Sequence, residues 1–183
     1  MRKKDREKFS PVRVRLKTGQ PCKIRFLQPS DGTKLAEFYQ SVPEEDLRFY
    51  HPYPLTRDQA FQNAREALSP DRVVLVLETD CGQLAGYAWY RWRKWAKKST
   101  FGMCIRREFQ GKGAGKTLMS RLLEVARKVG PRVMSLTVQV ANHPAVNLYR
   151  QMGFVILRQQ RQEHRGYPHF APEPEYYMEK RVR

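Results

Sequence analysis

Residues 110–117 read Gln-Gly-Lys-Gly-Ala-Gly-Lys-Thr and place three glycines and two lysines within eight residues. Residues 100–105, directly before this stretch, predict a short strand. After it, apolar residues recur at helical spacing until Gly130 and Pro131 end the run; they are Leu118, Leu122, Val125, Ala126 and Val129. Glycine allows positive φ, and the first N–H groups of a helix lack internal partners. The pattern therefore predicts a phosphate site, which the helix dipole would stabilise by about 0.3–2 kcal/mol.

The end of this stretch, Gly115-Lys116-Thr117, is similar to a nucleotide-binding P-loop. A P-loop also needs a glycine five residues before Gly115, where this chain has Gln110. The next predicted strand, residues 133–140, has no aspartate to assist a magnesium ion. These differences disfavour a nucleotide site. From this motif alone, a turn that only joins a strand to a helix remains open.

Taken as Gln-x-x-Gly-x-Gly, residues 110–115 resemble the coenzyme A pyrophosphate loop of the GNAT superfamily of N-acetyltransferases. A second segment, residues 142–154, resembles the downstream motif of the same family, Asn-x-x-Ala-x-x-Leu-Tyr-x-x-x-Gly-Phe. It matches at every named position: Asn142, Ala145, Leu148, Tyr149, Gly153 and Phe154. Two motifs in the right order and spacing make coincidence a poor explanation. The resemblance covers residues 22–182 as a pattern and is sharp over residues 99–155.

The resemblance and the hydrophobic pattern together predict the GNAT fold, an α/β fold with a mixed, mostly antiparallel sheet and helices on both faces. Strands are expected at residues 11–16, 22–27, 73–77, 84–92, 99–105, 133–140, 154–160 and 176–182. Helices are expected after Ser30 or Asp31, after Thr56, after the glycine-rich stretch and after Asn142, with a short polar turn at residues 43–46. Residues 11–183 should form a single N-acetyltransferase domain, preceded by a basic, disordered arm at residues 1–10.

The composition favours a cytoplasmic protein with an anionic partner. Lys and Arg number 35 against 18 Asp and Glu, which gives a net charge of +17. Such an excess favours nucleic acid, a ribosomal surface, an acidic membrane or a phosphorylated cofactor. The three cysteines lack metal or disulfide spacing, which indicates a reducing compartment. No stretch reads as a signal or a membrane span, so no membrane partner is expected, and the oligomeric state stays open between monomer and homodimer.

The resemblance implies that acetyl-CoA is the co-substrate, with no metal. It assigns donor binding to Gln110, Gly111, Lys112, Gly113, Ala114, Gly115, Lys116 and Asn142. It also implies that residues 99–105 splay from the strand at 133–140, so that the amides of Met103, Cys104 and Ile105 can pair with the pantetheine arm. The Ile105 N–H should face the thioester oxygen, where one donor is typically worth about 3–4 kcal/mol. Tyr149 takes the position of the family's general acid, although it could instead only pack beside the cofactor.

The general base is not assigned by the resemblance. A free lysine has a pKa of about 10.4, so its amine must lose a proton before it can attack. Protein-lysine acetyltransferases of this type carry a glutamate early in the strand that corresponds to residues 99–105, where this chain has Ser99 and Thr100. Glu78, at the end of a neighbouring strand, is a substitute, as are His51, His143 and a chain of water molecules.

The acceptor remains open among a protein lysine, a protein N-terminus and a small amine. Residues 14–27 and 43–49 loosely resemble the acetyltransferase domain of bacterial protein-lysine acetyltransferases, and the net acidic helices of residues 30–68 favour a cationic amine. A different class of function also remains open. Five aromatic residues among basic ones suggest base stacking by a nucleic-acid or ribosome-binding protein with a catalytically weak acetyltransferase fold; they are Tyr87, Trp89, Tyr90, Trp92 and Trp95.

Overall fold

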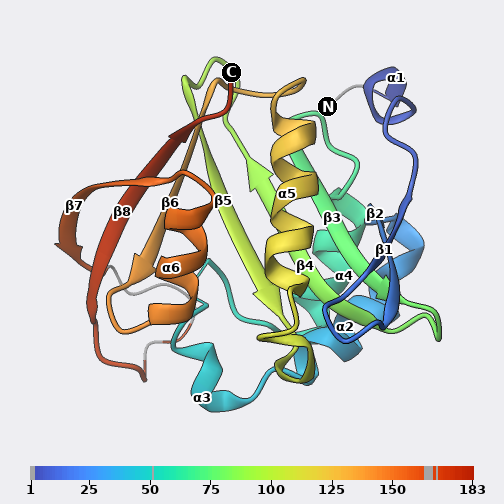
Figure 1. Cartoon of the computed structure of the whole chain (residues 1–183), viewed down its shortest axis with the longest axis horizontal. Coiled ribbons are helices and arrows are strands. Elements are labelled where there is room, and N and C mark those ends of the chain that lie inside the picture. Colours follow the sequence, from blue (N-terminus) through green and yellow to red (C-terminus); the bar gives the residue numbers. More distant parts are fainter. Residues whose placement is uncertain (1–2, 51, 163–166, 168) are drawn as a thin grey trace.

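The computed structural model describes residues 3–50, 52–162, 167 and 169–183. One eight-stranded sheet runs through it in the order β1-β2-β3-β4-β5-β6-β8-β7 (Figure 1). The strands are β1 (Val12–Arg15), β2 (Pro21–Phe26), β3 (Arg72–Thr79), β4 (Leu84–Arg91), β5 (Lys98–Ile105), β6 (Val133–Gln139), β7 (Val155–Arg161) and β8 (Pro174–Arg181). The helices are α1 (Lys3–Arg6), α2 (Gly32–Gln40), α3 (Glu44–Leu47), α4 (Arg57–Glu66), α5 (Ala114–Ala126) and α6 (His143–Gln151), with 3-10 turns at Pro29–Asp31 and Arg107–Phe109.

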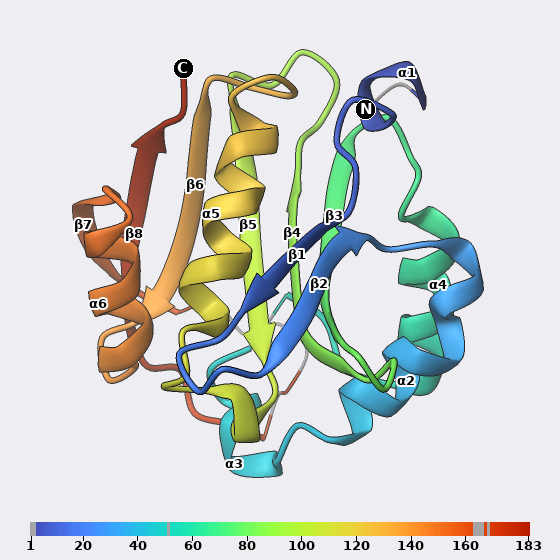
Figure 2. The ribbon, with the colours of Figure 1, turned by 45° about the vertical axis from the view of Figure 1, so that its right-hand side comes forward.

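Apolar side chains cover both faces of this sheet, so its central strands read as continuous hydrophobic runs rather than alternating ones. Every residue of β3 except the first is buried. One cluster packs β3, β5 and β6 against α5 and α6, and a second packs the opposite face of β3 and β4 against α2 and α4. Figure 1 shows α5 and α6 in front of the sheet, and Figure 2 shows α2 and α4 on its other side. The predicted mixed, mostly antiparallel sheet with helices on both faces is confirmed.

The helix starts follow from the residues that precede them. The Thr56 hydroxyl accepts a hydrogen bond from the Gln59 N–H, and the Asn142 side chain accepts one from the Ala145 N–H at 3.3 Å. Both are N-caps, which satisfy a backbone donor that the helix itself leaves without a partner. The cap of α5 is different, because Gly113 takes this position with a left-handed backbone and no side chain.

The pairing of β5 with β6 is the one parallel pairing in the sheet, and it is short. It joins Lys98–Thr100 to Val133–Ser135 and stops there, although β5 continues to Ile105 and β6 to Gln139. Beyond Thr100 the two strands therefore separate, as the sequence analysis expected. The gap opens at the end of the sheet where α5 and α6 begin.

Three local segments add detail to the expected pattern. Residues 3–6 form a one-turn helix, and the Arg6 guanidinium donates to the carbonyl oxygens of Ala67 and Ser69. Residues 44–47 form α3 rather than a turn. Four of the five aromatic rings are not free to stack with a ligand, because Tyr87, Trp89 and Tyr90 are buried, as expected for side chains that alternate between two covered faces, and Trp92 is half-buried against Tyr90. The fifth ring, Trp95, is exposed.

No helix in the part of the chain that the structure describes has the length and the apolar character needed to cross a membrane.

Candidate active site

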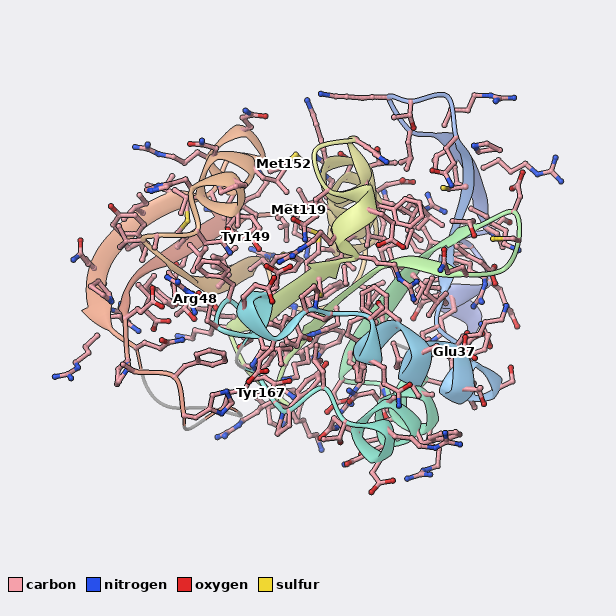
Figure 3. All side chains as sticks on the ribbon, turned by 90° about the horizontal axis from the view of Figure 1, so that it is seen from below. Glu37, Arg48, Met119, Tyr149, Met152 and Tyr167 are labelled. Atoms are coloured by element: carbon pink, nitrogen blue, oxygen red, sulfur yellow. The ribbon has the colours of Figure 1, made fainter. Side chains whose placement is uncertain are left out.

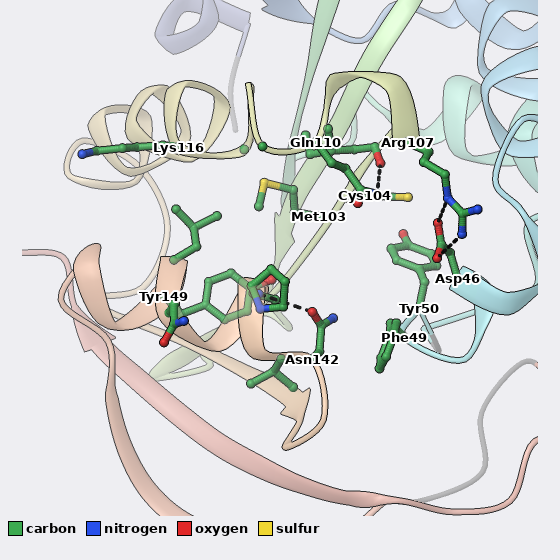
Figure 4. Close-up of a pocket in the computed structure, with 18 of the residues that line it drawn as sticks. Asp46, Phe49, Tyr50, Met103, Cys104, Arg107, Gln110, Lys116, Asn142 and Tyr149 are labelled. Atoms are coloured by element: carbon green, nitrogen blue, oxygen red, sulfur yellow. Dashed lines mark hydrogen bonds and ion pairs between the residues drawn. The ribbon is translucent and has the colours of Figure 1, made fainter. Parts of the chain in front are cut away.

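A cavity of about 490 Å³ lies at the end of the sheet where β5 and β6 separate. Its walls come from the ends of these strands, the glycine-rich loop, the start of α6 and the segment around α3. Figure 3 looks onto this end of the molecule, with Tyr149 on α6 among the labelled residues. Figure 4 shows the lining residues in detail.

The glycine-rich loop presents backbone donors to this cavity. Gly111 and Gly113 have φ of 70° and 88°, a left-handed conformation that L side chains rarely adopt. The first backbone bond of α5 runs from the Thr117 N–H to the Gly113 carbonyl at 3.0 Å, so the N–H groups of residues 114–116 have no partner within the helix. An anion at this position would meet those N–H groups and the positive end of the helix dipole.

Lys17, from the turn between β1 and β2, adds a charge that the sequence analysis did not identify. Its N–H donates to the Lys112 carbonyl at 3.0 Å, and its side chain lines the cavity. A Cβ on Gly113 would lie 3.3 Å from the Lys17 Cγ. With Lys116, two cationic side chains therefore flank the loop.

The end of β5 presents a second set of backbone donors. The Arg106 N–H donates to the Ala85 carbonyl on β4 at 3.0 Å, and in an antiparallel ladder the residues that bond to the neighbour alternate. Cys104 therefore bonds towards β4, while the N–H groups of Met103 and Ile105 face the gap beside β6. The expectation that all three amides are free was wrong for Cys104. The Ile105 carbonyl on the gap side accepts from the Gln110 Nε2 at 3.0 Å, which leaves the Ile105 N–H for a ligand.

Tyr149 borders the same cavity from α6. Its ring packs edge-on against Phe101, with ring centroids 5.8 Å apart. It also packs at a tilt against Phe154, with centroids 6.0 Å apart. Burial raises the pKa of the Tyr149 phenol, and the nearby Cys104 thiol adds to the shift. Burial also raises the pKa of Cys104 to about 12. Both groups therefore hold their protons at neutral pH, Tyr149 as a proton donor and Cys104 as a thiol rather than a thiolate.

The opposite wall holds a carboxylate that the sequence analysis missed. Asp46 lines the cavity, and Arg107 donates to its two oxygens at 2.7 and 3.1 Å and to Glu45 at 2.7 Å (Figure 4). Asp46 is the one carboxylate among the described residues that line the cavity. Phe49 and Tyr50 complete this wall. The run of acids at residues 44–46 was visible in the sequence, but only the tertiary contact with Arg107 places it beside β5.

The segment after α3 is held to the end of β6 and to the residues just before β8. Arg48 donates to the Glu173 carboxylate at 3.0 Å, and the Gln139 side chain donates to the Arg48 carbonyl. Tyr50 is fixed by its hydroxyl, which accepts from the Trp89 indole at 3.0 Å and donates to Tyr53 at 3.0 Å. These bonds position the wall that contains Asp46.

The structure does not support Glu78 as the general base. Glu78 is 5% exposed and does not line the cavity. Arg25 donates to it at 2.8 Å and Lys34 at 2.7 Å, and Lys23 lies 3.1 Å away. The hydrogen bonds from Arg25, with those from Lys34 and Lys23, hold the pKa of this carboxyl well below its usual range. A carboxylate that is so strongly stabilised in its charged form is a poor proton acceptor.

The other predicted residues divide as follows. The cavity is lined by Met103, Cys104, Ile105, Gln110, Gly111, Gly113, Gly115, Lys116, Asn142 and Tyr149. Lys112 and Ala114 do not line it; the Ala114 side chain is buried in the core, and Lys112 meets Lys17 through its carbonyl. His143 is exposed at the start of α6 and does not line the cavity either. His51 lies outside the described residues. Ser99 is buried, and its hydroxyl donates to the Val133 carbonyl rather than to the cavity.

The described residues contain no group of three or more His, Cys, Asp or Glu side chains that could hold a metal ion.

Comparisons with known proteins agree with this geometry. Residues 35–154 match the family described as "Acetyltransferase (GNAT) family". An L-amino acid N-acyltransferase of Escherichia coli (strain K12) is 27% identical over 140 residues, which cover 74% of this chain and 81% of that protein. The GNAT domain of S. lividans PAT has a TM-score of 0.75 at 21% identity, covering 93% of this chain and 96% of the other. The spermidine N-acetyltransferase of Vibrio cholerae, solved with CoA and spermine, has a TM-score of 0.71 at 20% identity, covering 88% and 95%. The two structural likenesses show a shared fold.

Proposed function

Since the chain belongs to the acetyltransferase (GNAT) family and is an acyl-CoA-dependent N-acyltransferase, we propose that it transfers an acetyl group directly from acetyl-CoA to a primary amine. One observation carries this proposal: the backbone donors at the start of α5 and at the end of β5 converge on a single cavity. The acceptor classes are a protein lysine, a protein N-terminus and a small amine. By their names, the E. coli relative acts on L-amino acids and the V. cholerae protein on spermidine, so the family name alone does not select among these.

The residues at the cavity fit coenzyme A. The N–H groups of residues 114–116, with Lys17 and Lys116, would hold the pyrophosphate, and the N–H groups of Met103 and Ile105 would pair with the extended pantetheine arm. Acetyl-CoA supplies the acetyl group as an activated thioester. The side chain of Gln110 donates to the Ile105 carbonyl, so that Ile105 offers its N–H group, rather than its carbonyl oxygen, to the ligand.

Two groups of this chain would then stabilise the transfer. The Ile105 N–H donates to the acyl oxygen as negative charge develops on it, and one such donor is typically worth about 3–4 kcal/mol. Tyr149 holds a proton at its Oη, and because burial raises its pKa it keeps that proton at neutral pH. It can therefore protonate the departing sulfur.

Asp46 would serve the acceptor. Its carboxylate attracts an ammonium group, while the bidentate contact with Arg107 fixes its orientation, and the proton of the ammonium would leave through water. Glu78 has no place in this proposal, because it lies in an ion-paired cluster away from the cavity.

The free thiols of Cys22, Cys81 and Cys104 support a reducing compartment, and we propose the cytoplasm as the place of action.

Ligand binding tests the donor assignment. Acetyl-CoA at about a hundred times its Kd should stabilise the protein by about 2.7 kcal/mol, which a thermal melt detects as a higher Tm. ATP with magnesium is the matched control, since it carries phosphates without a pantetheine arm. A larger shift with ATP than with acetyl-CoA would overturn the proposal and restore the nucleotide site.

A substitution on α3 tests the acceptor assignment. Once a panel of amines, peptides and ribosomal proteins has identified an acceptor, Asp46→Asn should raise KM for the amine at least about tenfold and leave KM for acetyl-CoA unchanged. Glu44→Gln removes a charge from the same helix at a residue that does not line the cavity, and should leave both constants unchanged. Equal effects of the two substitutions would remove Asp46 from the acceptor site.

A further inference from the structure

Exposed basic side chains gather at the end of the molecule opposite the cavity. They lie in three segments: the β4–β5 hairpin, the α5–β6 connection and the C-terminal end. The members are Arg91, Arg93, Lys94, Lys97, Lys98, Arg127, Lys128, Arg132, Arg181 and Arg183, and together they form what we call the basic end. Figures 1 and 2 show the three segments at the upper edge of the molecule, with α3 at the lower edge.

Contacts between the three segments hold the basic end together. The Val182 N–H donates to the Arg132 carbonyl at 2.9 Å, and the Arg183 guanidinium donates to the Gly130 carbonyl. Lys98 lies opposite Val133 in the β5–β6 pairing. The basic end is therefore one continuous surface built on the sheet, rather than three separate loops.

Its charge is mostly left without a counterion from the protein. Residues 91–98, 127–132 and 181–183 contain no aspartate or glutamate. Within the described part of the chain, Lys98 forms an ion pair with Glu179, and no other member of the basic end forms one with a carboxylate. Several arginines elsewhere in the described part of the chain are paired, among them Arg25, Arg72 and Arg107. A surface with so many unpaired cations attracts a polyanion.

An exposed tryptophan stands among these cations. Trp95 is 89% exposed, whereas large aromatic side chains are usually buried, and it is the one large apolar side chain exposed on the three segments. The Lys94 ammonium lies 5.5 Å from the centroid of its ring. Trp95 also has a φ of 66°, the only positive φ of a non-glycine residue in the part of the chain that the structure describes. Such a conformation costs about 1–3 kcal/mol, so the hairpin presents this ring at an energetic cost.

We propose that the basic end binds single-stranded nucleic acid, with phosphates against the lysines and arginines and a base stacked on Trp95. Stacking on an aromatic ring beside unpaired cations is how proteins hold single strands without reading their sequence. A single exposed ring suits one base better than a lipid surface, which would need a broader apolar patch. Because the basic end and the cavity lie at opposite ends of the sheet, a bound strand would leave the cavity open.

Fluorescence anisotropy tests this with labelled oligo(rU) and oligo(dT) of about 15 nucleotides, a length near the upper site size of single-strand binders. Binding should weaken with salt, with a log–log slope of about −0.7 for each phosphate contact. The triple variant Arg93→Glu, Lys94→Glu, Lys97→Glu should lose most of the affinity and flatten that slope by about 2. Trp95→Ala should weaken binding by about 5-fold to 100-fold, and Trp95→Phe should restore most of it.

A charge-matched control distinguishes this surface from general electrostatics. Arg13→Glu, Arg57→Glu and Arg65→Glu change three exposed arginines on β1 and α4 and should reduce binding far less.

An equal loss in the control, no effect of Trp95→Ala, or no binding at low salt would each overturn the proposal. Stronger competition by phosphatidylcholine–phosphatidylserine vesicles than by unlabelled oligonucleotide would overturn it in favour of a membrane surface. Tighter binding of either oligonucleotide supports it, and a preference for oligo(rU) identifies the ribose hydroxyl as a further contact. All variants should keep the acetyl-CoA-induced rise in Tm, which shows that they are folded.

Discussion

The side-chain amide of Gln110 donates to the carbonyl oxygen of Ile105 at 3.0 Å, and this bond joins the glycine-rich loop to the end of β5. It links two sets of backbone donors, one at the start of α5 and one at the end of the strand. Gln110→Ala should therefore loosen the alignment of the two sets. Because an exposed neutral hydrogen bond is worth about 0.5–1.5 kcal/mol, acetyl-CoA affinity should fall by about 2-fold to 12-fold, as measured by calorimetry. An unchanged Kd would show that the loop is held by its other contacts.

Gly113→Val should abolish acetyl-CoA binding. A β-branched side chain is strained at a φ of 88°, and its Cβ would meet Lys17 beside the phosphate site. Gly82→Val is the matched control, since Gly82 has a φ of 82° in the turn between β3 and β4, away from the cavity. Both variants should lose stability in a thermal melt, but only Gly113→Val should lose the ligand. Loss of binding in both variants would show that backbone strain, rather than the site, is responsible.

Tyr149→Phe should lower kcat by about 10²–10⁴ and leave acetyl-CoA affinity nearly unchanged, once an acceptor is known. The substitution keeps the ring that packs against Phe101 and Phe154 and removes only the hydroxyl. Since burial raises the pKa of Tyr149, the deficit should be the same at every pH between 6 and about 9. A wild-type kcat with a higher KM would instead assign Tyr149 to packing.

Glu78→Gln should lower the Tm and change how stability depends on acid. The pKa of Glu78 is depressed in the folded protein, so its contribution to stability is present above the unfolded-state pKa of about 4.3 and is lost as the pH falls below it. Thermal melts between pH 7 and pH 3 should therefore show a smaller loss of Tm in the variant than in the wild type. The KM for acetyl-CoA should not change. A tenfold fall in kcat with an unchanged Tm would return Glu78 to the list of bases.

The sequence predicted those parts of the molecule whose signal is local. The glycine-rich stretch, the Asn142 motif and the alternation of strands and helices were enough for the fold and for most of the donor loop. Lys17 and Asp46 were missed because each reaches the cavity from a distant segment, and nothing in their neighbouring residues shows it. Arg107 lies between two predicted site residues, but its contact with Asp46 is visible only in the fold.

Glu78 and the aromatic strand show the converse limit. Glu78 ends a strand beside a site, which suggested a base, but three cations from β2 and α2 occupy its oxygens. Tyr87, Trp89 and Tyr90 look like a surface in a basic sequence, but both faces of β4 are covered by helices. Charge pairing and two-sided burial are tertiary properties, so a residue's type and its position in a strand do not determine them.

The short pairing between β5 and β6 has a consequence for how the molecule moves. Only three residues of each strand pair across this line, so β6, α6, β7 and β8 form a flap. The flap is otherwise joined to the rest by packing against α5 and by the contacts of Arg48 with Gln139 and Glu173. An extended ligand in the gap would act as a temporary strand and close the sheet. Amide exchange in the flap should therefore slow when the ligand binds, and the protein should unfold from this line first when it is empty.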